Sequence, residues 1–353
     1  MTSTVGVLIG IEHPRSSIFL QAQLLNRLLE RRYGVRTEIH ATKWLALSDL
    51  WSWIGGDRPI IFHYGSFALA AFRLSNRKGT RFVYHNHTPF RFYWKWEPLV
   101  MLLDLCTELQ LKLLPRNTPW VAVSAFNAAC LEELGFESVK VCPLIVEASA
   151  PSAASSFEKT AIPTVIYVGR ISPHKQCIEL LSEIGRAAKL FGGRVRLEVV
   201  GDGKRGSRYL RAFEEKVATA RVAGELEIVW DREPVPATEL KARYERAWLY
   251  VSLSRHEGFG LPACEAVIAG TPSLYLECGG QETVMEGVGV VPLERRSEFA
   301  ARVAAFLRDE TTRRQLWIDQ LAVASRYCMD AVAPLVAGAY GDLLDEAYIA
   351  GGG

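Results

Sequence analysis

Short apolar runs, each bounded by polar or turn-forming residues, recur along the chain and predict buried strands. In the first half they are Val5–Ile11, Val35–Ile39, Pro59–Phe62, Arg81–Tyr84, Trp120–Val123 and Val139–Val141. In the second half they are Thr164–Val168, Arg196–Val200, Leu226–Trp230, Trp248–Leu253 and Ser273–Leu276. Segments with apolar residues at helical spacing, such as Ile18–Tyr33, separate these runs. Strands that alternate with helices predict parallel sheets covered on both faces, an α/β fold.

The two series of strands are separated by Pro151–Ser156, PSAASS, the clearest linker in the chain. We therefore expect two Rossmann-like domains, residues 1–155 and 156–330, that face each other across a cleft. The chain of 353 residues is long enough for two such cores. The tail from Ser297 to Tyr348 is predicted to be helical, and its last part, about 331–353, is expected to pack back on the first domain.

Composition narrows the class of protein. Hydrophobic residues make up 49% and charged residues 23%, with a net charge of +2, which is typical of a folded soluble protein and not of a bulk nucleic-acid binder. The seven cysteines include no CxxC pair, which favours reduced thiols in a cytoplasmic protein. No basic leader precedes the first apolar run, and no uncharged apolar run reaches about 18 residues, so neither a signal peptide nor a membrane span is predicted.

The most informative stretch is Val251–Pro272, VSLSRHEGFGLPACEAVIAGTP. It predicts a short strand, a glycine-rich bend and a helix with Pro262 at its first position. Gly270 marks the end of that helix, because glycine readily adopts the left-handed conformation that stops one.

Charged and small residues surround this bend. Glu257 lies before it, and Glu265 is expected in the first turn of the helix. Gly258 and Gly260 let a ligand approach the backbone, and a helix N-terminus favours an anion. Carboxylates beside an anion site fit a nucleotide sugar, which carries both hydroxyls and phosphates.

Three further segments could contribute to such a site. The stretch YVGRISPHK carries Arg170 and Lys175 in one loop after a strand, where they could bind phosphate or could simply be solvated. Val199–Gly203, VVGDG, runs from a strand into a turn, and Cys278–Val291, CGGQETVMEGVGVV, is a glycine-rich loop followed by a helical turn and a strand. Each signal is weak alone.

In this order and at this spacing, the four segments resemble the retaining glycosyltransferases of family 4, which have the GT-B fold. The resemblance implies that Arg170 and Lys175 hold the donor diphosphate and that Glu265 binds the ribose. It implies a catalytic set of His85, Glu257, Arg170 and Lys175. The implied donor-binding set is Arg170, Lys175, Gly201, Gly258, Phe259, Gly260, Leu261 and Glu265. The implied reaction needs no metal or other cofactor, and the chain contains no Asp-x-Asp pair.

The first half matches the family more loosely. The stretch Arg58–Trp96 contains seven Arg or Lys residues, eleven aromatics and no Asp or Glu. In the family, a histidine at a strand end in this half faces the donor sugar, and His85 fits that position best, with His87 in reserve. A structural histidine is the alternative for both. A metal held by His85 and His87 lacks a recognisable third ligand, so we expect no metal site.

The first loop of the chain departs from the family pattern. The family often has a glycine-rich loop there, whereas this chain has IEHPRSS, Ile11–Ser17, preceded by Gly10. His13 and Arg15 could replace backbone amides as contacts to the acceptor. The candidate acceptor-binding residues are therefore Gly10, His13, Arg15 and His87.

Residues 91–114 allow two interpretations. Arg91–Trp96, RFYWKW, precedes a predicted helix, Leu99–Leu114, on which Asp104, Glu108 and Lys112 form one polar stripe. The helix could be a core helix with a solvated edge. Alternatively, the segment could lie in the headgroup region of a membrane and bring the enzyme to a lipid-linked acceptor. Single-stranded nucleic acid also fits this composition, but the second half makes a nucleic-acid partner improbable.

The sequence thus predicts a retaining glycosyltransferase. It would move a sugar from a nucleotide-diphosphate sugar to a glycan or lipid-linked acceptor in polysaccharide or glycolipid biosynthesis. We expect it in the cytoplasm, with a peripheral contact at the inner face of the membrane as a hypothesis. The alternatives are a GT-B sugar-nucleotide epimerase or hydrolase, and a non-catalytic scaffold that binds nucleotide sugars.

Overall fold

The computed structural model describes residues 4–9, 17–41, 54–55, 58–64, 68–86, 89–147, 159–222, 226–233 and 235–351. The chain forms two compact units. Unit 1 comprises Met1–Pro89, Leu102–Glu147 and Tyr327–Gly353, and unit 2 comprises Phe90–Met101 and Ala148–Arg326. The predicted linker at 151–156 lies outside the described residues. The sequence did not indicate that Phe90–Met101, here called the crossing segment, packs with unit 2.

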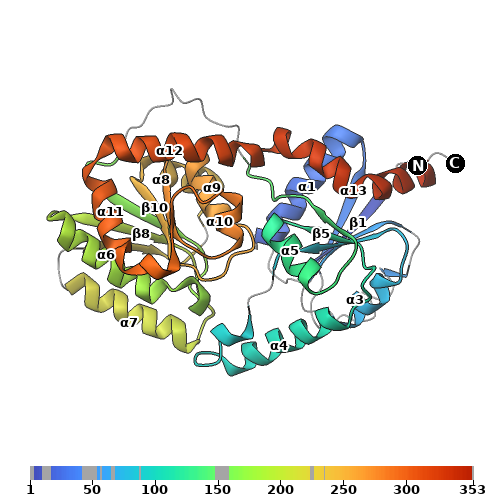
Figure 1. The fold of residues 1–353 in the computed structure, drawn as a ribbon, viewed down its shortest axis with the longest axis horizontal. Coiled ribbons are helices and arrows are strands. Elements are labelled where there is room, and N and C mark those ends of the chain that lie inside the picture. The colour runs from blue at the N-terminus through green and yellow to red at the C-terminus, as the bar shows by residue number, and fades with distance from the viewer. Residues whose placement is uncertain are drawn as a thin grey trace. The chain divides into compact units, whose positions relative to one another are not determined.

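Unit 1 is built on a six-stranded parallel sheet (Figure 1). Its strands, in spatial order, are β2 (Arg36–Ala41), β1 (Thr4–Ile9), β3 (Ile60–His63), β4 (Thr80–Tyr84), β5 (Trp120–Ala122) and β6 (Val139–Val141). Its helices are α1 (Ser17–Tyr33), α3 (Ala68–Ser75), α4 (Pro98–Leu113), which begins in the crossing segment, α5 (Ala125–Glu133) and α13 (Met329–Gly351).

Alternating strand residues bury the two faces of this sheet. Phe62, Phe82 and Trp120 point to the face covered by α3, α4 and α5. Helices α1 and α13 contact the strands as well, and the Tyr33 hydroxyl donates a 2.8 Å hydrogen bond to the carbonyl of Ala333. The end of the chain thereby packs on unit 1.

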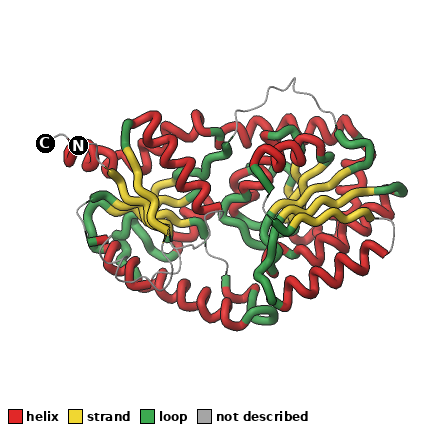
Figure 2. Tube along the Cα trace, turned by 180° about the vertical axis from the view of Figure 1, so that it is seen from behind, coloured by secondary structure: helices red, strands yellow, loops and turns green. Residues whose placement is uncertain are grey.

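Unit 2 contains a second six-stranded parallel sheet, seen from behind in Figure 2. Its strands, in spatial order, are β9 (Leu226–Asp231), β8 (Val195–Val200), β7 (Thr164–Val168), β10 (Leu249–Ser252), β11 (Ser273–Leu276) and β12 (Val290–Val291). Its helices are α6 (Cys177–Phe191), α7 (Arg208–Val222), α8 (Ala237–Arg246), α9 (Leu261–Ile268), α10 (Gly280–Val284), α11 (Phe299–Arg308) and α12 (Glu310–Ala324).

Residues of β7 show how unit 2 buries both faces of its sheet. Val165 and Tyr167 belong to the large core shared with α6, α7 and α11. Ile166, between them in sequence, packs on the opposite face with residues of α8 and α9. The continuous apolar runs seen in the sequence follow from this double burial.

The strand orders locate the places where each sheet can receive a ligand. In unit 2 the order reverses direction between β7 and β10, and in unit 1 between β1 and β3. Loops that leave neighbouring strands in opposite directions at such a point open a crevice at the carboxyl ends of the strands. The loops after β7 and β10 carry most of the predicted donor residues, whereas Gly201 follows β8 and Glu265 lies on α9.

Most predicted strands and helices are confirmed within two residues at each end. The α/β class with two Rossmann-like sheets is also confirmed. Helix α9 begins at Leu261, so Pro262 is its second residue and Glu265 lies in its second turn; placing Glu265 in the first turn was wrong. None of the helices in the described part of the chain combines the length and hydrophobicity needed to cross a bilayer.

Candidate functional site

The loops after β7 and β10 bring three of the predicted catalytic side chains into one unit. Lys175 ends a short 3-10 turn, Pro173–Lys175, and its ammonium group forms an ion pair with the Glu257 carboxylate. The side chains of Lys175 and Glu257 are only 19% and 15% exposed, so water screens this pair weakly. Arg170, in the same loop as Lys175, is exposed.

A third loop holds Glu257 in place. The amide of Gly280 donates a 3.0 Å hydrogen bond to the carbonyl of Glu257, and Glu257 forms an isolated parallel bridge with Gly279. Gly279 and Gly280 follow β11, so Glu257 is contacted by the loops after β7 and β11. Its carboxylate is therefore positioned from two sides rather than carried on a free loop.

Gly201, at the carboxyl end of β8, is required by close backbone packing. A Cβ atom at this position would lie 2.0 Å from the carbonyl oxygen of Gly169, and the residue has a φ of +150°. Gly169 precedes Arg170, so Gly201 determines how closely the Arg170 loop approaches β8. The role in donor binding expected for Gly201 is thus accompanied by a structural one.

Little side-chain surface is exposed at the bend that precedes α9. Gly260 caps the helix in the left-handed conformation, at a φ of 87°, and its Cα packs against the Gln281 side chain. The Phe259 side chain is buried, with 3% exposed, so Phe259 could present only its backbone to a ligand. Leu261 is partly exposed at the first turn of α9.

Glu265 extends from α9 and accepts a 3.2 Å hydrogen bond from the hydroxyl of Tyr244, on α8. Burial raises the pKa of Glu265 above its ordinary value of 4.5, and the bond from Tyr244 partly offsets that effect. A partly desolvated carboxylate with one oxygen already engaged retains acceptor capacity for the hydroxyls of a ligand.

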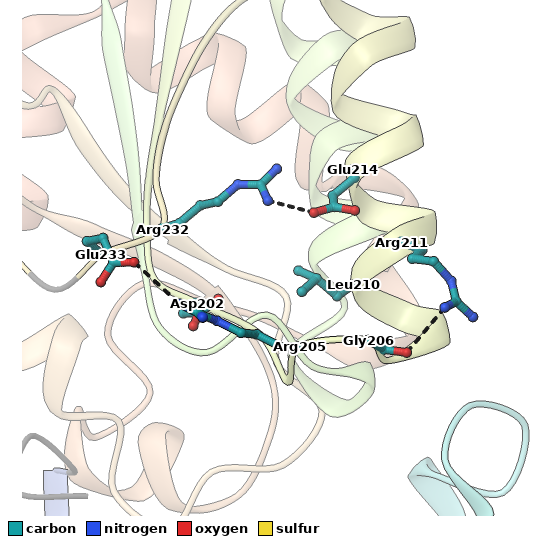
Figure 3. A pocket seen from close by; sticks show the side chains of 8 residues that line it. All are labelled: Asp202, Arg205, Gly206, Leu210, Arg211, Glu214, Arg232 and Glu233. Atoms are coloured by element: carbon teal, nitrogen blue, oxygen red, sulfur yellow. Dashed lines mark hydrogen bonds and ion pairs between the residues drawn. The ribbon is translucent and has the colours of Figure 1, made fainter.

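A cavity of about 280 Å³ lies at the carboxyl ends of β8 and β9. Figure 3 shows its lining residues, Asp202, Arg205, Gly206, Leu210, Arg211, Glu214, Arg232 and Glu233. Arg232 pairs with Glu214 at 2.7 Å, Arg205 pairs with Glu233 at 3.6 Å, and Arg211 donates to the carbonyl of Gly206. The cations of this cavity are therefore satisfied by groups of the protein itself.

The crossing segment contributes side chains to the same unit. The Tyr93 hydroxyl lies 3.2 Å from Nδ1 of His174, the residue before Lys175. Trp96 packs edge-to-face on Tyr209, with 5.0 Å between the ring centroids. Two of the aromatic residues expected in a membrane headgroup region, Tyr93 and Trp96, thus pack within unit 2, whereas Trp94 is 62% exposed.

In unit 1, His85 follows β4 and pairs with a histidine that the sequence analysis missed. Nδ1 of His63, the last residue of β3, lies 2.8 Å from Nε2 of His85, and the two rings stack. Burial lowers the pKa of His85 to about 4, and burial together with His85 holds the pKa of His63 well below its usual value. Both rings are neutral near pH 7, so each has one donor and one acceptor nitrogen.

The sequence did contain a signal for His63, because this histidine follows the predicted strand Pro59–Phe62 just as His85 follows the predicted strand Arg81–Tyr84. From the sequence alone, however, a catalytic histidine at a strand end cannot be distinguished from one that only stabilises the fold. Nε2 of His63 is buried and has no hydrogen-bond partner among the described residues.

The four candidate acceptor residues, Gly10, His13, Arg15 and His87, lie outside the described residues. Within the described part of the chain, no group of three His, Cys, Asp or Glu side chains is placed to hold a metal ion.

Comparison with known proteins agrees with the motifs. Residues 162–309 match the family model described as "Glycosyl transferases group 1". This region contains Arg170, Lys175, Glu257 and Glu265, and the match confirms the resemblance to glycosyltransferases. Over 195 residues the chain is 31% identical to D-inositol 3-phosphate glycosyltransferase of Frankia alni, an alignment that covers 53% of this chain and 47% of that protein. The chain thus spans about half the length of this relative.

Solved structures extend the similarity in fold to both units. Sucrose-phosphate synthase from Thermosynechococcus elongatus superposes with a TM-score of 0.76 at 16% identity, over 98% of this chain and 100% of that one. HepE of Anabaena, solved in complex with UDP-glucose, gives 0.69 at 14% identity, over 96% and 100%. The GT-B fold predicted from the motifs is confirmed.

Proposed function

We propose that the protein is a retaining glycosyltransferase that takes a sugar from a nucleotide-diphosphate sugar. The observation that carries the proposal is the Lys175–Glu257 pair. It lies at the point where the strand order of unit 2 reverses, within the region that matches glycosyl transferases group 1. The relative named a glycosyltransferase supports sugar transfer, and the complex of HepE with UDP-glucose supports a nucleotide sugar as the donor.

The charges of this site suit departure of a nucleoside diphosphate. When the bond from the sugar to the diphosphate breaks, negative charge grows on the phosphate oxygens. Arg170 and Lys175 would stabilise that charge, and they would do so most effectively where water is excluded. Glu265 would accept hydrogen bonds from the ribose. The cations replace the role that a metal has in other sugar-nucleotide enzymes, so we propose that transfer needs no metal.

Replacing the donor residues tests this proposal. Thermal shift with UDP, GDP and ADP identifies the base, because a ligand that binds only the folded state raises its stability. Glu265→Ala and Lys175→Ala should abolish both the shift and the transfer of sugar. Lys241→Ala removes an exposed lysine of α8 in unit 2 and serves as the matched control. Full turnover in both site variants would refute the assignment.

Two rival functions make different predictions. An epimerase or hydrolase would consume the nucleotide sugar equally fast with and without an acceptor. A scaffold would bind the nucleotide diphosphate without transfer to any acceptor.

We further propose that the acceptor is lipid-linked or lies at a membrane surface. Support comes from the exposed side of α4 in unit 1. Leu102, Leu109 and Leu113 are 52%, 52% and 70% exposed, and Cys106 is exposed between them. The spacing of these residues places them on one face of the helix.

Of the polar stripe expected on α4, Asp104, Glu108 and Lys112, only Lys112 is exposed. Asp104 and Glu108 are half-buried, and one carboxylate oxygen of Asp104 is buried without a partner among the described residues. Burial, together with Glu108, raises the pKa of Asp104 to about 6. The exposed face thus carries leucines and Lys112 rather than carboxylates, a combination that suits an anionic lipid surface.

Vesicle flotation tests the membrane contact. With phosphatidylcholine vesicles that contain phosphatidylglycerol, wild type should float, and Leu109→Glu or Leu113→Glu should remain at the bottom with an unchanged melting temperature. Leu190→Glu is the control, because Leu190 is 48% exposed on α6 of unit 2. Equal loss in the control, or no flotation of wild type, would remove the support for a membrane contact.

A further inference from the structure

A second cavity in unit 2, of about 350 Å³, has a cationic and aromatic lining. The described residues that line it are Arg91 and Phe92 of the crossing segment and Arg255 of the loop after β10. Both arginines are exposed, and neither forms an ion pair with any described residue. No carboxylate is among these lining residues.

The contrast with the cavity of Figure 3 is informative. There, Arg232 and Arg205 pair with carboxylates that line the same cavity. Arg91 and Arg255 have no such compensation, so two guanidinium groups bring uncompensated positive charge to one hollow. Like charges that converge repel each other, and an anion in the hollow would relieve that repulsion.

The two segments that line this cavity, the crossing segment and the loop after β10, both form hydrogen bonds with His174. The Tyr93 hydroxyl, two residues after Arg91, lies 3.2 Å from Nδ1 of His174. The backbone amide of Arg255 donates a 2.8 Å hydrogen bond to the carbonyl of His174. Trp96 packs on Tyr209 further along the crossing segment.

His174 contributes no competing positive charge. It is only 7% exposed. Burial, followed by the charges of Lys175, His256 and Arg170, holds its pKa well below the usual value. His174 thus serves as a neutral hydrogen-bonding group that positions both arginines, one residue before the Lys175–Glu257 pair.

We propose that this cavity binds an anionic substituent, a carboxylate or a phosphate, on one of the sugars of the transfer reaction. Arginine offers a planar fork that matches two oxygens of either group. The Phe92 ring lies 6.4 and 6.2 Å from the rings of His174 and His256, measured between centroids, and provides an apolar wall for the sugar. The inference rests on the proposed function and narrows its substrate class.

The anionic group could belong to the donor sugar or to the acceptor, and paired probes separate the two. For the donor, UDP-glucuronate is compared with UDP-glucose. For the acceptor, glucose 1-phosphate and glucose 6-phosphate are compared with glucose, on the whole chain in the presence of excess UDP. Binding is measured by calorimetric titration of wild type, Arg91→Gln, Arg255→Gln and the double variant.

In one of the two arms, wild type should bind the charged probe at least tenfold more tightly than its neutral counterpart. Each single variant should lose about tenfold for the charged probe, the usual worth of a hydrogen bond to a charged group, and should bind the neutral probe as wild type does. Arg186→Gln is the control, because it removes an exposed arginine of α6 that pairs with Glu183.

The outcomes distinguish this inference from the proposed function. If UDP stabilises the protein but neither arm discriminates charge, the inference is overturned and the donor site stands. If UDP does not bind while the glucose phosphates still discriminate, the anion cavity stands and the donor assignment fails. An equal loss of charged-probe binding in Arg186→Gln would also overturn the inference, because the effect would then be one of net charge.

Discussion

Replacing Gly201 by alanine tests the packing between the strand ends that carry the candidate donor site. The new Cβ would lie 2.0 Å from the carbonyl oxygen of Gly169, far inside van der Waals contact. Gly201 cannot move away easily. Its amide donates a 3.0 Å hydrogen bond to the carbonyl of Asp231, and its carbonyl accepts a 2.9 Å bond from the Trp230 indole.

The cost has two parts. Overpacking against a fixed backbone typically costs about 1–3 kcal/mol. A side chain at a φ of +150° adds about 1–3 kcal/mol of backbone strain. We therefore expect Gly201→Ala to lower the free energy of unfolding of unit 2 by about 2–6 kcal/mol, which at about 2–4 °C per kcal/mol corresponds to a fall in melting temperature of roughly 4–24 °C. Displacement of Gly169 should also move Arg170 and weaken nucleotide binding.

Differential scanning calorimetry with and without UDP measures both effects. Two glycines of unit 2 serve as controls. Gly206→Ala shares a positive φ, +75°, but its Cβ would meet no atom within 4 Å, so it reports strain without a clash. Gly185→Ala in helix α6 has open space and should be neutral or stabilising by about 1 kcal/mol. If Gly201→Ala melts no lower than Gly206→Ala, the close approach of the two strand ends is not rigid and the reasoning is refuted.

Three further predictions concern the ionisable groups. Because burial raises the pKa of Glu265, its ionised form destabilises the fold, and stability from this group falls as the pH rises from about 4.5 through the raised value. Glu265→Gln should therefore raise the melting temperature near pH 7 by about 2–4 °C per kcal/mol regained while abolishing the shift caused by UDP; a lower melting temperature would contradict this. Lys175→Met should cost about 3 kcal/mol in urea unfolding, because it leaves Glu257 buried and unpaired, and the double variant with Glu257→Gln should recover most of that loss but no activity. His63→Phe should lower kcat about tenfold without changing UDP affinity, because His85 loses the partner that orients it; an unchanged kcat would place His85 outside the reaction.

The loops that carry the candidate donor residues could be predicted from the sequence because their signals are local. Only glycine fits at Gly201, where a Cβ atom would lie 2.0 Å from the carbonyl oxygen of Gly169. A strand followed by glycines and the start of a helix also positions backbone groups without help from distant parts of the chain. The sequence did not reveal which side chains would form hydrogen bonds with the candidate donor residues. The bond from Tyr244 to Glu265 joins residues 21 apart, and no periodicity marks a tyrosine as a hydrogen-bond donor to a helix glutamate.

The crossing segment shows the limit of composition. Trp94 and Trp96 are two residues apart in a run of basic and aromatic residues, yet Trp96 packs on Tyr209 while Trp94 is 62% exposed. Which aromatic residue is buried depends on how the crossing segment, which follows β4, packs on unit 2. That packing depends on contacts such as the one between Tyr93 and His174, which is 81 residues away in the sequence.

Helix α4 shows why unit 1, the candidate acceptor-binding unit, was harder to predict from the sequence. A pattern of polar and apolar positions orients a helix only if the polar side faces water. On α4 the rule holds only in part: Leu111 is buried and Lys112 is exposed, but Asp104 is half-buried with its pKa raised to about 6 while Leu109 and Leu113 are 52% and 70% exposed. The burial of the Asp104 carboxyl and the exposure of these two leucines both cost free energy in water. Conflicts of this kind between pattern and structure are expected where a surface is shaped by a partner rather than by water. The exposed leucines are therefore consistent with the proposed contact between the outer face of α4 and a membrane surface.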